Sequence, residues 1–137
     1  MSAYYILSQK TNFSYEVIVC DDASPDNTFD VIQHLGSAYS NLVILRNEVN
    51  LGLVATMHRL LNTATGEFIA YLDGDDIALP GKLQQQVDYL DANSQCTLVY
   101  HESEVFDSNS GAVLKYFSQD YYNYQHIPQQ RACCAVS

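Results

Sequence analysis

The sequence contains no tryptophan and only six basic residues against sixteen acidic ones, which gives a formal net charge of −10. An excess of negative charge repels nucleic acid and anionic membrane surfaces, so it argues against a nucleic-acid partner. The same charge repels the phosphates of a nucleotide. A nucleotide ligand would therefore need a cation between its phosphates and the protein.

Several other familiar signals are missing. The four cysteines show no C-x-x-C spacing and no histidine at metal-site spacing, so reduced thiols in a cytoplasmic protein fit best. No apolar run approaches the ~20 residues of a membrane span, and no signal-peptide pattern opens the chain. The G-x-G-x-x-G turn of dinucleotide-binding folds is also absent.

The chain instead alternates short apolar runs with segments of helical periodicity. Strands joined through helices by short links predict a mainly parallel sheet with flanking helices. Further along, two short apolar runs on either side of 107–111 predict a hairpin. The expected fold class is α/β, with residues 1–137 forming one domain. The predicted strands are 15–20, 42–45, 67–72 and 97–100, and the predicted helices are 24–36, 53–66 and 80–90.

Acidic clusters follow two of the predicted strands directly. Asp21 and Asp22 follow the first strand, and Asp73, Asp75 and Asp76 follow the third. Ligands of open α/β sheets bind beyond the carboxyl ends of parallel strands, so both clusters are expected to share one cleft. Clustered carboxylates repel one another unless a cation neutralises them, and carboxylate oxygens suit Mg²⁺ or Mn²⁺.

A structural explanation competes with the functional one at each aspartate, because Asp after a strand often forms a turn or caps a helix. We prefer that explanation for Asp26 and Asp30 and weigh it equally for Asp21. Three carboxylates within residues 73–76 are costly to pack without a ligand, so metal binding is favoured there. A phosphohydrolase that uses a D-x-D motif would need a Lys and further acidic residues downstream. We favour it less, because Lys82 and Asp88 match that pattern only by chance.

Four blocks in a fixed order resemble family 2 glycosyltransferases. They are V-I-V-C-D-D-A-S-P-D-N-T at 17–28, N-L-G at 50–52, A-T-G-E-F-I-A-Y-L-D-G-D-D at 64–76 and P-G-K-L at 80–83. The resemblance covers roughly residues 5–115. It implies a GT-A, Rossmann-like fold and an inverting, metal-dependent transferase in cell-surface polysaccharide biosynthesis. The implied donor is a nucleoside-diphosphate sugar of UDP type, while the acceptor (a sugar, a lipid-linked group or a protein) is left open.

The resemblance also implies roles for individual residues. Asp22 would contact the nucleotide base, and Asp73 and Asp75 would be the D-x-D pair. Asp75 would be the direct ligand of Mn²⁺ or Mg²⁺, with Asp73 beside it. Asp76 would lie near the donor sugar or would contact the metal ligands without binding the ion itself.

The sequence departs from the family pattern in three ways. The usual opening strand is absent, and residues 3–11 resemble the end of the helix that follows it. A phosphate-facing Arg after the N-x-G loop is also missing, although Arg59 is close by. Glu102, Glu104, Asp107 and Asp120 are not marked as a catalytic base, so none is assigned.

We therefore expect a domain truncated at its N-terminus that lacks the C-terminal catalytic part. Such a chain would be the donor- and metal-binding portion of a glycosyltransferase. The alternatives are an inactive fragment that binds metal and nucleotide, and a fragment without function.

Overall fold

The computed structural model describes residues 2–117 and 133–134. The chain divides into two compact units, Met1–Gln84 and Gln85–Ser137, and each is described by itself. All predicted donor-site residues belong to the first unit.

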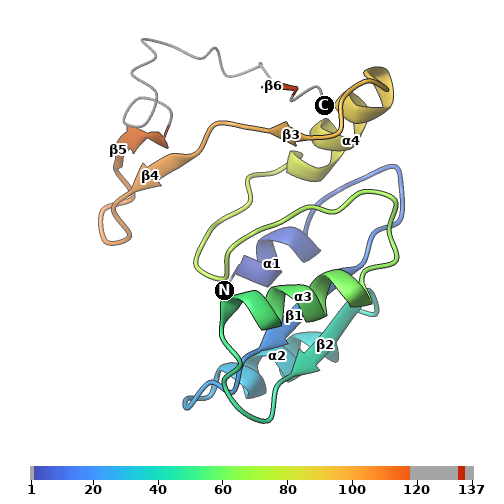
Figure 1. The fold of residues 1–137 in the computed structure, drawn as a ribbon. Coiled ribbons are helices and arrows are strands. Elements are labelled where there is room, and N and C mark those ends of the chain that lie inside the picture. Colours follow the sequence, from blue (N-terminus) through green and yellow to red (C-terminus); the bar gives the residue numbers. More distant parts are fainter. Residues whose placement is uncertain (1, 118–132, 135–137) are drawn as a thin grey trace. The chain divides into compact units, whose positions relative to one another are not determined.

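The first unit is built on a two-stranded parallel sheet (Figure 1). β1 (Val17–Asp21) pairs with β2 (Leu42–Arg46), and the register places Val17 opposite Leu42 and Asp21 opposite Arg46. Both strands consist mainly of β-branched and aliphatic residues, which suit a covered sheet. Since the strands are parallel, their carboxyl ends lie at the same edge.

Helices cover this sheet. α2 (Thr28–Gly36) connects the two strands and packs against both, while α1 (Ser2–Leu7) and α3 (Leu53–Thr63) pack against β1. Leu7 of α1 and Ile32 of α2 are buried by this packing. The remaining buried apolar residues of the described part are Val17, Ala78 and Leu83.

The second unit contains two short antiparallel pairings. β3 (Val99–Tyr100) pairs with β6 (Cys133–Cys134), and β4 (Glu104–Phe106) pairs with β5 (Val113–Tyr116) as a hairpin. α4 (Lys82–Ala92) begins in the first unit and continues into the second.

The α/β class, the first two parallel strands, the helix after β2 and the hairpin are confirmed. The predicted strand at 67–72 is wrong, because this segment pairs with no other strand among the described residues. A strand exists only where a neighbour accepts its backbone hydrogen bonds, and Phe68, Ile69 and Tyr71 are exposed here. The predicted fourth parallel strand is also wrong, since β3 pairs antiparallel with β6.

The three predicted helices correspond to α2, α3 and α4, and the prediction for α4 (80–90) is off by two residues at each end. Boundaries of α2 and α3 differ from the prediction for local reasons. α2 begins at Thr28 rather than after Ser24, because Asp26 Oδ1 accepts the Thr28 N–H at 3.0 Å and forms a turn there. α3 ends at Thr63 rather than at Gly66. Glu16 Oε1 accepts the Thr65 N–H at 2.8 Å, which holds the chain beyond α3 outside the helix.

The cysteines also correct an expectation. Cys20 is a free thiol, whereas Cys96 is disulfide-bonded, so the prediction that all cysteines are reduced is wrong at Cys96. Sequence spacing does not reveal which distant cysteines meet in the fold. Among the described residues, no helix has the length and apolar character needed to span a bilayer.

Candidate functional site

Asp21, the last residue of β1, is buried and contacts both the loop after β1 and the end of β2. Its Oδ1 accepts the Ser24 N–H at 3.3 Å, and its Oδ2 lies 3.5 Å from Nε of Arg46 on β2. Asp21 Oδ2 accepts no hydrogen bond among the described residues, so its contact with Arg46 is an ion pair without a hydrogen bond. The Arg46 guanidinium in turn lies 4.2 Å from the centre of the Phe29 ring. Asp21 therefore has a structural role in this structure.

Asp22 holds the loop that precedes α3. Its Oδ1 accepts hydrogen bonds from Asn47 Nδ2 at 2.7 Å and from the Leu51 N–H at 2.8 Å. Its Oδ2 accepts the Gly52 N–H at 2.9 Å. The Asn47 amide, followed by the Leu51 N–H, lowers the pKa of Asp22 against the opposing effect of burial. The Thr56 side chain adds a smaller hydrogen-bond contribution that also lowers this pKa.

Asn47 connects Asp22 to α3. It is only 2% exposed, and its Nδ2 also donates to Thr56 Oγ1 at 2.9 Å. Its Oδ1 accepts a hydrogen bond from the guanidinium of Arg59, which also donates to the Arg46 carbonyl at 2.7 Å. Arg59 thus points toward the carboxyl end of β2. The sequence left this direction open.

Two unusual backbone conformations shape this end of the sheet. Gly52 has φ 80° and ψ 167°, a region that is essentially restricted to glycine, and this conformation precedes the first turn of α3. Ala23 has φ 59°, which is uncommon for a residue with a Cβ. Both residues adjoin the hydrogen bonds of Asp22.

The second acidic cluster forms a turn over 73–76. The Asp76 N–H donates to the Asp73 carbonyl at 3.2 Å, which closes the turn. Two buried side chains of the N-terminal segment anchor the region: Ser2 Oγ donates to the Gly74 carbonyl at 2.7 Å, and Gln9 Nε2 donates to the Leu79 carbonyl at 3.0 Å. The turn is fixed through its backbone, while Asp73, Asp75 and Asp76 are exposed.

Tyr71 is the nearest hydrogen-bond partner of this turn. Its hydroxyl donates a hydrogen bond to Asp73 Oδ1. This bond, with smaller contributions from burial and the nearby carboxylates, raises the pKa of Tyr71, so the hydroxyl stays protonated near neutral pH. Lys82 Nζ donates to the Tyr71 carbonyl at 3.4 Å. Burial lowers the pKa of Lys82, and the Asp76 charge partly opposes that effect.

The predicted residues therefore fall into two groups of contacts. One contains Asp22 with Asn47, and the other contains Asp73 with Tyr71. No hydrogen bond or ion pair between described residues joins the two groups, so a shared cleft stays a prediction. Sequence reasoning missed the roles of Asn47 and Tyr71. The partner of Asn47 is distant in the sequence, and Tyr71 lay in a segment predicted to be a strand.

The donor set of the acidic turn fits a hard divalent cation, subject to one restriction. Among the described residues, no three His, Cys, Asp or Glu side chains converge as a ready-made metal site. Mg²⁺ usually takes only one or two carboxylates and completes its shell with phosphate oxygens and water. Asp75 and Asp73 match that pattern as exposed carboxylates on an anchored turn.

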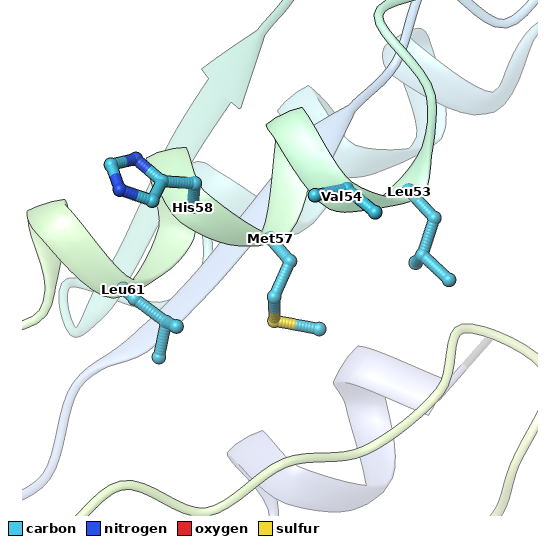
Figure 2. A pocket seen from close by; sticks show the side chains of 5 residues that line it. All are labelled: Leu53, Val54, Met57, His58 and Leu61. Carbon is cyan, nitrogen blue, oxygen red and sulfur yellow. The ribbon is translucent and has the colours of Figure 1, made fainter.

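Other candidate residues do not contribute to this site. The side chains of Leu53, Met57 and Leu61 point to one side of α3 and line an open apolar hollow with Val54 and His58 (Figure 2). His58 is a polar helix residue whose Nδ1 lies 2.9 Å from Asn62 Nδ2.

Two acidic residues of the second unit accept hydrogen bonds from residues close by in the sequence. Asp107 accepts hydrogen bonds from the Asn109 N–H at 3.0 Å and from Ser110 Oγ at 2.8 Å. Its carboxylate organises the hairpin turn. Glu102 Oε1 accepts the Ser103 N–H at 3.0 Å. Asp120 lies outside the described residues.

A comparison with known families identifies the chain. The family model described as glycosyl transferase family 2 matches residues 5–136. The chain belongs to glycosyl transferase family 2. This membership confirms the family resemblance and, with the parallel sheet and the hairpin, the GT-A, Rossmann-like fold class.

Individual relatives agree with this family. The Bacillus subtilis protein named glycosyltransferase EpsE is 37% identical over 103 residues, which cover 74% of this chain and 37% of the relative. Two Escherichia coli proteins, WfgD and WfaP, are 35% and 32% identical over 74% and 80% of this chain. Both are named UDP-Glc:alpha-D-GlcNAc-diphosphoundecaprenol beta-1,3-glucosyltransferase. The chain spans 37%, 39% and 47% of the lengths of these three relatives.

Proposed function

We propose that this chain is the donor- and metal-binding portion of an inverting glycosyltransferase that uses a nucleoside-diphosphate sugar. The observation that carries the proposal is the turn at 73–76, where three exposed carboxylates stand on a backbone held by Ser2. An exposed acidic turn on a fixed backbone suits a cation that must also bind phosphate oxygens. The strongly acidic composition supports a cation-bridged donor for the same reason.

Within this proposal, Asp75 and Asp73 hold Mn²⁺ or Mg²⁺, and Asp76 lies near the donor sugar. When bound, the metal ion would neutralise negative charge on the diphosphate leaving group. Asp22 would accept a hydrogen bond from the base of the nucleotide. The bonds of Asp22 to Asn47, Leu51 and Gly52 keep its carboxylate in one orientation and lower its pKa, which favours the charged form.

The substrates are proposed from the relatives. WfgD and WfaP carry names with UDP-Glc as donor and a diphosphoundecaprenol-linked sugar as acceptor. We extend from these names a UDP-type donor, a lipid-linked acceptor and a role in cell-surface polysaccharide synthesis. The alternative is a protein that binds metal and nucleotide without transferring a sugar.

A cytoplasmic location is part of the proposal, and the Cys96 disulfide allows it to be tested. Cytosolic proteins rarely keep disulfides. Maleimide labelling of Cys96 after acid quenching of cells should succeed if the protein is cytoplasmic. Protection of Cys96 from labelling would contradict that location.

Calorimetric titration of UDP into the folded chain, with Mn²⁺ and then with a chelator, tests the proposed function. Binding that requires Mn²⁺ would support a donor site, and binding that ignores the chelator would refute the metal's role. Release of glucose from UDP-glucose, or its transfer to a lipid-linked acceptor, would separate the enzyme from the inactive alternative.

A further inference from the structure

Tyr71 is held at two points beside the acidic turn. Its hydroxyl donates to Asp73 Oδ1, and its carbonyl accepts a hydrogen bond from Lys82 Nζ at 3.4 Å. The side chain is half-exposed, so packing alone does not fix its position. The two hydrogen bonds restrict the orientation of Tyr71 relative to the turn.

The two carboxylate oxygens of Asp73 differ in their contacts. Oδ1 is occupied by the tyrosine hydroxyl, whereas Oδ2 accepts no hydrogen bond from the described residues. The Asp73 carbonyl is engaged as well, because it accepts the Asp76 N–H. The backbone and one carboxylate oxygen of Asp73 are therefore fixed, and the second oxygen is available to a ligand.

We propose that Tyr71 is a positioning residue that orients the Asp73 carboxylate, so that Oδ2 serves the divalent cation of the proposed donor site. This inference rests on the proposed function. Partners that hydrogen-bond to a metal-ligating carboxylate orient it, and their loss typically costs about 10–100-fold in metal affinity. Tyr71 acts through Asp73 and is given no contact with the donor.

The chain supplies a matched control for this role. Tyr4 is 53% exposed and Tyr71 is 51% exposed, so the two rings have similar access to solvent. Within the described part of the chain, the Tyr4 hydroxyl makes no hydrogen bond, and its ring has an edge contact with Tyr5. Tyr4→Phe thus removes the same atom without removing a partner of the acidic turn.

The experiment is calorimetric titration of the Mn²⁺–UDP complex into the whole chain and its Tyr71→Phe and Tyr4→Phe variants. We expect Tyr71→Phe to weaken binding by about 10-fold or more, with Tyr4→Phe close to the unmodified chain. A thermal melt of each variant checks that folding is unchanged. Equal affinity of Tyr71→Phe and the unmodified chain would overturn the inference and leave the proposed function standing.

A double-mutant cycle separates positioning from a general structural effect. If Tyr71 acts through Asp73, Tyr71→Phe should change the affinity little when Asp73→Ala is already present, because alanine leaves no oxygen to accept the Tyr71 hydroxyl. An equal loss in both backgrounds would overturn the inference. Absence of Mn²⁺–UDP binding by the unmodified, folded chain would overturn the proposed function and this inference together.

Discussion

The Asp22 carboxylate accepts a hydrogen bond of 2.9 Å from the backbone N–H of Gly52, thirty residues further along the chain. This contact joins the residue after β1 to the residue before α3. It also places a negative charge beside the N-terminus of α3, where the helix dipole favours it. The first predictions follow from this contact and its neighbours.

Replacing Asp22 by Asn should lower the stability of the chain at neutral pH. An amide group offers one acceptor atom in place of two, so the variant loses the contact of Asp22 with Leu51 or with Gly52, although Asn50 Oδ1 also accepts the Gly52 N–H at 3.1 Å. The pKa of Asp22 is lowered from 3.8, so its charged form stabilises the fold fully above that pH. This contribution disappears as the pH falls through the lowered pKa.

Urea denaturation at neutral pH and below pH 3.8 measures this effect. The difference in midpoint between the chain and its Asp22→Asn variant should shrink in acid. A difference that stays the same at both pH values would show that charge on Asp22 does not contribute.

Gly52→Ala should lower the free energy of unfolding by about 1–3 kcal/mol. No atom lies within 4 Å of a Cβ added at Gly52, so the cost comes from its φ of 80° and not from a clash. Gly74→Ala is the matched control, because Gly74 has similarly open space and no positive φ. Equal effects of the two substitutions in urea denaturation would contradict this explanation.

Ala23→Gly should leave the chain as stable or stabilise it by up to about 1 kcal/mol. Glycine relieves the cost of φ 59° but gains entropy in the unfolded state. Ala55→Gly, an exposed change within α3, should instead destabilise by about 1 kcal/mol. Chemical denaturation measures the free energy of unfolding of both variants. A large loss of stability in Ala23→Gly would contradict the backbone strain assigned to Ala23.

Asn47→Ala should destabilise the chain by about 1–3 kcal/mol, because it removes the buried amide that hydrogen-bonds to the buried Thr56 hydroxyl and to two further side chains. Its amide connects Asp22, Thr56 and Arg59. Asn62→Ala removes an exposed amide that hydrogen-bonds to His58, one turn earlier in α3, and should have little effect. Comparable losses in the two variants, measured by thermal unfolding, would argue against a central role for Asn47.

The helices and strands that could be predicted from sequence were those with a clear apolar periodicity and with a neighbouring element to pack or pair with. β1, β2 and α3 carry clear apolar patterns, and they were found with small errors at their ends. Segment 67–72 has an equally apolar pattern but lacks a pairing strand among the described residues. An apolar run specifies burial or pairing only when the rest of the fold supplies a neighbour.

The candidate site was predictable to a similar degree. The positions of Asp22 and of the acidic turn followed from the ends of apolar runs. Their hydrogen bonds did not, because the contacts of Asp22 with Gly52 and of Ser2 with Gly74 span 30 and 72 residues. The Tyr71–Asp73 hydrogen bond is local. It was not predicted, because residues 67–72 were expected to form a strand and the Tyr71 hydroxyl was given no partner.

The central claim is that the acidic turn holds the cation of a nucleotide donor. Calorimetric titration of UDP with Mn²⁺ into the Asp75→Asn and Asp30→Asn variants tests it most directly, because both changes remove one exposed negative charge. We predict that Asp75→Asn abolishes Mn²⁺-dependent binding and that Asp30→Asn preserves it. Unchanged Mn²⁺-dependent binding by a folded Asp75→Asn variant would contradict the assignment of Asp75 as the metal ligand.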